Sequence, residues 1–198
     1  MTKSLDEMTN EELWELFPII ICNHIPEWKD NYLIEKAVIE KVIGIDNILR
    51  INHIGSTAVP NLIAKPTIDI LVEIKDATDT EKLIINMKEA GYIYSPQPDN
   101  AAPHMMFMKG YTNEGFKGQV YHVHVRYSGD WDELYFKDYL LSHPDVAGEY
   151  GKLKLELKQK FEYNRDGYTY AKTDFIKKIT KLARVEMENK YDVRFKGY

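Results

Sequence analysis

The sequence predicts an α/β (α+β) fold, in which a small mixed β-sheet is backed by helices and the C-terminal third is helical. Two apolar runs of strand length, 48–54 and 67–74, lie on either side of a Gly-Ser turn. From about residue 130 the pattern is helical, with breaks at His143-Pro144 and at 164–167. A chain of 198 residues can bury a sizeable core. We therefore expect one domain, 1–198, with 130–190 as its helical C-terminal region.

Each element follows from a local signal. Thr9 and Glu12 form a capping-box pattern before the first helix, and Gly44 and Gly91 stand where two later helices should end. The segment 109–118 contains three glycines and predicts the loop of a hairpin. The expected helices are 9–17, 27–42, 78–90, 130–141, 144–163 and 169–190, and the expected strands are 48–54, 67–74, 92–94, 104–108 and 119–126.

Composition limits the class of protein. The net charge is −5, which is not typical of a protein that binds a nucleic-acid backbone, although a local basic pocket for one anionic small molecule is allowed. The single cysteine, Cys22, permits no internal disulfide, and its isoleucine neighbours favour a buried thiol. The sequence shows no signal-peptide core and no apolar run near the roughly 20 residues of a membrane helix. We expect a cytoplasmic protein without membrane contact.

The turn between the two strands is the first candidate site. Glycine lets a backbone approach a ligand closely, and the Ser56 hydroxyl with nearby N–H groups can hold phosphate oxygens. The proline that follows Lys65 keeps the Lys65 backbone extended, and the side-chain ammonium could bind a phosphate as a point charge. Gly55, Ser56 and Lys65 are therefore candidate phosphate-binding residues, although Gly-Ser turns and surface lysines are common in proteins without such sites.

Asp69 lies inside the apolar run 67–74, where a carboxylate is costly unless it is paired or binds a metal. It is a candidate catalytic and metal-binding residue, or a structural acid that accepts hydrogen bonds. A two-metal site needs a second acid two residues further on, and that position is Leu71. Glu73 shares the face but lies roughly 13 Å away, at about 3.3 Å per residue. Two-metal nucleotidyl transfer is therefore doubtful.

The strand 119–126 carries the remaining candidates. Its period-two alternation puts His122, His124 and Arg126 on one face. Two histidines at this spacing can share a metal with Asp69, and the guanidinium could clamp a phosphate. A solvated polar face is the alternative. His53 is equally consistent with packing, and the alternating Lys and Glu of 152–160 predict a solvated helix surface.

Several blocks resemble the GrpB family. The most specific are His53-Ile-Gly-Ser-Thr-Ala-Val-Pro60 and Lys65-Pro-Thr-Ile-Asp-Ile70. The resemblance extends from about Trp28 to Ala183. Further blocks that carry it are His124-Val125, Phe136-Lys-Asp-Tyr-Leu140 with His143-Pro144, Tyr150 with Leu153-Lys154, and Tyr168-Thr-Tyr-Ala-Lys172 with Phe175-Ile176.

The resemblance implies a nucleotidyltransferase-like fold in a family of poorly defined activity. A similar domain also occurs fused behind dephospho-coenzyme A kinase in some bacteria, which suggests a nucleotide or coenzyme context. Three positions depart from the family pattern. Asn61 replaces a usual Gly, Lys137 replaces a usual Arg, and Leu141 stands where a basic residue is common.

Two functions are consistent with these residues. The first is a metal-dependent nucleotidyltransferase or nucleotide-phosphate-processing enzyme that uses a divalent ion, Mg²⁺ or Mn²⁺ or else Zn²⁺. The second is a non-catalytic module that binds a nucleotide or a coenzyme A-related molecule. Either way, we expect the partner to be a nucleotide or another phosphorylated small molecule.

Overall fold

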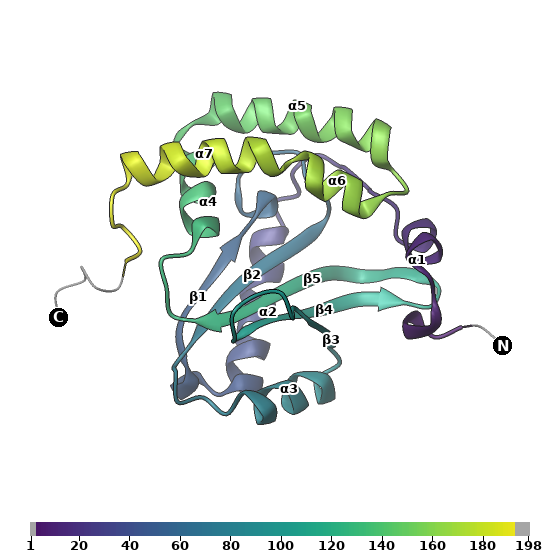
Figure 1. Ribbon diagram of the computed structural model, residues 1–198, viewed down its shortest axis with the longest axis vertical. Coiled ribbons are helices and arrows are strands. Elements are labelled where there is room, and N and C mark those ends of the chain that lie inside the picture. The colour runs from purple at the N-terminus through teal and green to yellow at the C-terminus, as the bar shows by residue number, and fades with distance from the viewer. Residues whose placement is uncertain (1–2, 193–198) are drawn as a thin grey trace.

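The computed structural model describes residues 3–192, so residues 1–2 and 193–198 of the expected domain lie outside it (Figure 1). Within this range a five-stranded sheet is combined with seven α-helices. The elements are α1 (Asn10–Leu16), α2 (Trp28–Ile43), β1 (Ile48–Ile54), β2 (Thr67–Ile74), α3 (Thr80–Glu89), β3 (Ile93–Pro96), β4 (His104–Thr112), β5 (Gly115–Tyr127), α4 (Asp132–Ser142), α5 (Pro144–Phe161), α6 (Arg165–Ala171) and α7 (Thr173–Glu186).

The sheet is mixed, as predicted. Its order is β1-β2-β5-β4-β3, and β2 and β5 are its one parallel pair within residues 3–192. In that pair, Asp69 stands opposite His122 and Leu71 stands opposite His124. The central position of these two strands therefore places Asp69 and both histidines in the middle of the sheet.

The two faces of the sheet have different surroundings. One face presents fully buried aliphatic side chains, among them Ile70 and Val123, to α2 and α3. Because side chains alternate along a strand, the opposite face carries Asp69 and the histidines. That face points toward the helical layer of α5 to α7, which Figure 1 shows above the sheet, with α3 below it. The helical layer has its own core, which includes Tyr150 and Ile179.

Most of the predicted boundaries are confirmed within one or two residues. The Thr9 hydroxyl accepts a hydrogen bond from the Glu12 amide at 3.3 Å, which completes the capping box of α1. β1 and β2 have the predicted bounds, and Gly44 follows the last residue of α2. None of the helices in residues 3–192 has the length and apolar character that crossing a membrane requires.

The predicted ten-residue loop at 109–118 is wrong. β4 and β5 continue through most of it, with Tyr111 paired to Phe116 and a turn of two residues after Thr112. The ladder shifts register beside Gly110, whose φ is +92°. A Cβ atom there would lie 2.8 Å from the Gln119 carbonyl oxygen. The glycine therefore marks a bulge within the hairpin rather than its loop.

The predicted break at 164–167 lies instead at 162–164, and the single helix predicted after it is wrong. The Asn164 side chain accepts a hydrogen bond from the Gly167 amide at 2.7 Å, so it caps a helix that begins at Arg165. That helix, α6, ends before Lys172, and α7 starts at the next residue. The short helix places Arg165 at one end and Lys172 just beyond the other.

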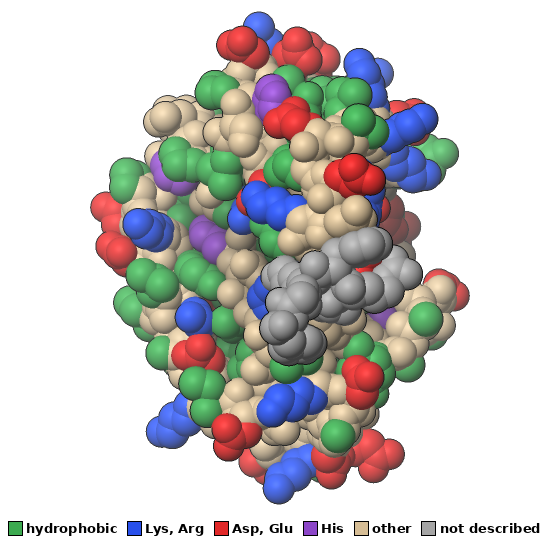
Figure 2. Space-filling model, turned by 90° about the vertical axis from the view of Figure 1, so that its left-hand side faces the viewer, with side chains coloured by type: hydrophobic (Ala, Val, Ile, Leu, Met, Phe, Trp, Pro, Cys, Tyr) green, Lys and Arg blue, Asp and Glu red, His purple; other side chains and the backbone are tan. Residues whose placement is uncertain are grey.

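Charged side chains are mixed on the outer surface. Figure 2 shows acidic and basic groups interspersed over the visible face. The described residues of this face therefore form no extended basic field of the kind that binds a nucleic-acid backbone.

Candidate functional site

A polar cavity of about 280 Å³ lies between the sheet and the helical layer. It collects five of the seven predicted site residues, and Gly55 and Arg126 are not part of its lining. The remaining lining comes mainly from α5 and α6. The residues that line it are Ser56, Lys65, Thr67, Asp69, His122, His124, Tyr150, Lys154, Arg165, Tyr168, Thr169 and Lys172.

Gly55 sets the distance between the turn and the carboxylate. Its φ of +69° and ψ of −170° belong to a region that only glycine occupies readily. A Cβ atom at this position would lie 2.6 Å from Asp69 Oδ2, closer than side chains can pack. The glycine is therefore required for the turn that carries Ser56 to pass directly over Asp69.

Asp69 is held by the two histidines. Its Oδ1 lies 3.3 Å from His122 Nδ1 and 3.8 Å from His124 Nε2. Burial alone would raise the pKa of Asp69, but the hydrogen bonds from these two imidazoles hold it well below its usual range. For His122, burial lowers the pKa despite the adjacent carboxylate. At neutral pH the site therefore contains an ionised Asp69 beside a neutral His122.

The contacts of His122 assign its tautomer. Its Nδ1 faces the Asp69 carboxylate, which can only accept, so Nδ1 carries the proton. Its Nε2 lies 2.7 Å from the Tyr111 hydroxyl and 3.4 Å from Arg165 Nη2. Since a guanidinium can only donate, Nε2 is the acceptor, and Tyr111 donates its hydroxyl proton to it. His122 Nε2 is thus a basic atom supported by Asp69.

Four cations converge on the cavity: Lys65, Lys154, Arg165 and Lys172. None of them forms an ion pair within 4.0 Å with a carboxylate in residues 3–192. Burial, followed by repulsion between neighbouring cations, lowers the pKa of Lys65 to about 7. Burial likewise lowers the pKa of Lys154 to about 7 and that of Lys172 to about 8. Asp69 attracts Lys65 and Lys172 and offsets part of this positive charge, but no carboxylate in residues 3–192 forms a direct ion pair with any of the four cations.

Two tyrosines complete the wall on the helical side. Tyr168 is 1% exposed, and its hydroxyl has no hydrogen-bond partner within the described range. Tyr150, also buried, lies under Lys154, whose Nζ is 4.7 Å from the ring centroid. A buried hydroxyl without a partner costs about 1–3 kcal/mol, so Tyr168 offers a donor that a ligand could satisfy.

Sequence reasoning missed most of this helical wall. The predicted solvated surface at 152–160 is wrong for Lys154, which is 2% exposed and donates to the Ile63 carbonyl. Arg165 lay in an expected loop. The family resemblance could have identified part of this wall, because the sequence blocks that carry it include Tyr150, Lys154, Tyr168 and Lys172.

Arg126 shares the predicted face but lies apart from the cavity. It forms an ion pair with Glu133 at 2.8 Å, and its guanidinium lies 4.6 Å from the Trp131 ring centroid. The cause is position, because Arg126 is near the end of β5, where the start of α4 supplies Glu133. The structure does not bring Arg126 together with Ser56 and Lys65.

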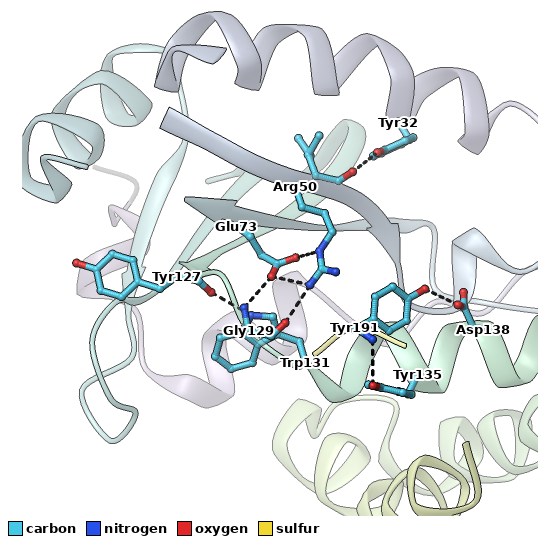
Figure 3. A network of polar contacts seen from close by, with 10 residues as sticks. Tyr32, Arg50, Glu73, Tyr127, Gly129, Trp131, Tyr135, Asp138 and Tyr191 are labelled. Atoms are coloured by element: carbon cyan, nitrogen blue, oxygen red, sulfur yellow. Dashed lines mark hydrogen bonds and ion pairs between the residues drawn. The ribbon is translucent and has the colours of Figure 1, made fainter. Parts of the chain in front are cut away.

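Glu73 belongs to a separate structural network (Figure 3). It is completely buried and accepts from Arg50 Nη2 at 2.7 Å and from the Gly129 amide at 3.0 Å. The same Arg50 nitrogen donates to the Gly129 carbonyl at 2.9 Å. Glu73 therefore joins β1, β2 and the segment before α4, and it is not a second acid for Asp69.

His53 and Asn61 have structural explanations. The His53 ring stacks on Tyr32 with centroids 4.9 Å apart, and its Nε2 is 2.9 Å from the Thr57 hydroxyl. Burial lowers the pKa of His53 to about 4, so it is neutral. Asn61, at the usual glycine position, has a φ of +63°, which asparagine tolerates better than most residues.

A divalent metal at Asp69 and the histidines stays a prediction. The distances of 3.3 and 3.8 Å would let pairs of these groups reach a common ion. Nevertheless, no group of three His, Cys, Asp or Glu side chains in residues 3–192 is arranged to hold a metal ion. Among the described residues, Asp69 and the two histidines therefore do not form a complete three-ligand protein site for a metal.

Comparison with known proteins gives a consistent result. Residues 18–182 match the family model described as GrpB protein. The Glutamate-rich protein GrpB of Alkalihalophilus pseudofirmus is 35% identical over 81% of this chain and 93% of its own length. The crystal structure of conserved protein GrpB from Enterococcus faecalis is similar with a TM-score of 0.74 and 31% identity, covering 84% of this chain and 98% of that one. A Dephospho-CoA kinase of Mycolicibacterium paratuberculosis is 25% identical over 65% of this chain and 37% of its own length.

Proposed function

The chain belongs to the GrpB family, and we propose that it binds a phosphorylated small molecule of the nucleotide or coenzyme class in the polar cavity and acts on its phosphate. The observation that carries this proposal is the set of four cations around Asp69 that form no ion pair with a carboxylate in residues 3–192. A phosphate or diphosphate supplies the negative charge that such a cavity lacks. The similarity to a Dephospho-CoA kinase supports the nucleotide or coenzyme class.

The cavity residues divide into two roles. Lys65, Arg165 and Lys172 bind phosphate oxygens and stabilise charge that develops there during transfer or hydrolysis. The Ser56 hydroxyl at the Gly-Ser turn adds a further contact to the same group. His122 Nε2 takes the proton of the attacking hydroxyl or water, and Asp69 keeps the imidazole in the tautomer that allows this. Tyr111, which now donates to Nε2, stands where that hydroxyl would arrive.

The alternative is a binding module without catalysis. Two observations favour it: Leu71 occupies the position of a second acid, and no three-ligand metal group is present among residues 3–192. In that case Asp69 and the histidines orient the cationic residues and recognise the ligand. Binding alone would then account for the whole site.

A thermal-shift screen with isothermal titration calorimetry tests the proposal. Nucleotides, coenzyme A and dephospho-coenzyme A are each added with and without Mg²⁺. A ligand at 100 times its Kd stabilises by about 2.7 kcal/mol, which raises the Tm of a chain of this size by roughly 5–10 °C. Lys172→Met should abolish the shift. The matched control is Lys178→Met, which removes an exposed lysine of α7 outside the cavity and should leave the shift intact.

A ³¹P NMR assay on the ligands that bind separates the two functions. In the enzyme, His122→Gln retains binding but abolishes turnover. In the binding module, the wild type converts no ligand. If no phosphorylated compound shifts the Tm, or if Lys172→Met binds as well as wild type, the proposal is wrong.

A further inference from the structure

A second cavity, of about 190 Å³, adjoins the polar one. The two share Lys65, Thr67 and Arg165 as a common wall. Each volume alone is smaller than the roughly 300–1,000 Å³ of typical small-molecule sites, but together they fall within that range. The shared wall makes them two compartments that one molecule can occupy.

The second cavity is lined by aromatic rings from separate parts of the chain. Phe17 follows α1, Tyr111 lies on β4 and Phe116 lies on β5. The Phe17 ring centroid is 4.9 Å from that of Tyr111 and 5.0 Å from that of Phe116. Phe116 is still 38% exposed. A flat ring bound in this cavity would contact the part of these aromatic side chains that the protein itself does not cover.

Beyond the wall shared with the polar cavity, two side-chain amides line this cavity, those of Asn31 and Gln119. Gln119 Nε2 donates to the Pro66 carbonyl at 2.9 Å, which fixes its side chain. Asn31 Nδ2 donates to Gln119 Oε1 at 3.3 Å, and both residues line the cavity. The lining, all of it within the described chain, contains no Asp or Glu. Such a compartment suits an uncharged ring with hydrogen-bonding edges and does not suit a cation.

We propose that the two cavities bind one bipartite ligand, a phosphate ester whose phosphate lies in the polar cavity and whose neutral heteroaromatic ring lies in the aromatic one. This inference rests on the proposed function for the phosphate half and adds the class of the other half. Lys65 and Arg165, on the shared wall, contact the phosphate nearest the ring-bearing group. The ligand is thus a nucleoside phosphate or a molecule that contains one.

Calorimetry with AMP, ribose 5-phosphate, n-octyl phosphate and inorganic pyrophosphate tests the inference. AMP should bind at least about tenfold more tightly than ribose 5-phosphate, since one stacked base contributes roughly that factor or more. Pyrophosphate should displace AMP, because both occupy the polar cavity. Phe116→Ala should remove most of the AMP advantage and leave ribose 5-phosphate binding unchanged. Ile85→Ala, which truncates a 55% exposed side chain on α3, is the control and should change neither.

Each other outcome has a defined meaning. Equal affinity for AMP and ribose 5-phosphate overturns the ring compartment while the proposed function stands. Tighter binding of n-octyl phosphate than of AMP assigns an alkyl chain to the aromatic cavity and also overturns the inference. Binding of AMP and pyrophosphate together shows two separate sites. If all four compounds fail to bind, this inference is wrong, and the proposed function is wrong as well if no nucleotide or coenzyme A compound of the thermal-shift screen binds.

Discussion

Replacing Gly55 by alanine should damage both stability and the site. The residue has φ +69° and ψ −170°, and strain of an alanine in such a conformation costs about 1–3 kcal/mol. The added Cβ would also stand 2.6 Å from Asp69 Oδ2 and 3.2 Å from Asp69 Cβ. Asp69 on β2 contacts His122 and His124 on the neighbouring strand β5, so the Asp69 side chain cannot move away from the added Cβ without breaking these contacts. For a chain of this size, at about 2–4 °C per kcal/mol, the Tm should fall by roughly 2–12 °C.

The informative comparison is with Gly91→Ala. Gly91 also has a positive φ, +88°, but a Cβ there meets nothing within 4 Å. This control therefore carries backbone strain without contact with a functional residue. Urea unfolding should show a larger loss for Gly55→Ala than for Gly91→Ala, and calorimetry with AMP should show weaker binding only for Gly55→Ala. Equal stability and equal AMP affinity of the two variants would show that Gly55 is not needed to leave room for the Asp69 side chain.

Three further predictions separate structure, charge and metal. Glu73→Gln should cost about 3 kcal/mol in urea unfolding, because it breaks a buried ion pair with Arg50, and unchanged AMP affinity should confirm that the network is structural. AMP affinity should weaken as pH rises from 6.5 to 9, because Lys65 and Lys172 lose protons near their pKa values of about 7 and 8. Over the same range the free energy of unfolding of the ligand-free protein should increase, because these lysines have pKa values near 10.5 in the unfolded chain, which therefore binds more protons than the folded one. An AMP affinity that rises with pH would contradict this prediction. EDTA should leave AMP affinity unchanged, and a loss that Mg²⁺ restores would show that the site requires a metal after all.

The sheet, and the face of it that carries Asp69 and the two histidines, could be predicted because their signals are local. The runs 48–54 and 67–74 have strand length and period, so the bounds of β1 and β2 are confirmed without a shift. Alternation along β5 placed His122 and His124 on one face. Their meeting with Asp69 needed one further fact, the parallel pairing of β2 with β5, and periodicity does not determine which strands are neighbours.

The helical wall could not be predicted because its signals depend on tertiary contacts. Asn164 and Gly167 are typical of a loop, but an asparagine that accepts from an amide three residues on is equally typical of a helix cap. Lys154 lies among alternating charges that indicate a solvated face. Its burial follows from packing of α5 against the 61–63 segment, where the Ile63 carbonyl accepts from its Nζ. No pattern within α5 shows that contact.

The positive charge of the cavity gives a physical reason why a second acid is absent beside Asp69. In a two-metal site, paired carboxylates exist to hold ions that neutralise phosphate charge. Under the proposed function, Lys65, Arg165 and Lys172 supply that neutralising charge directly, so a second carboxylate at position 71 is not needed to hold an ion. Leu71 is instead fully buried and packs with Ile54 and Leu134 under α4. An acid introduced there would be desolvated among Ile54 and Leu134, and this is why Leu71→Asp should destabilise the fold rather than create a metal site.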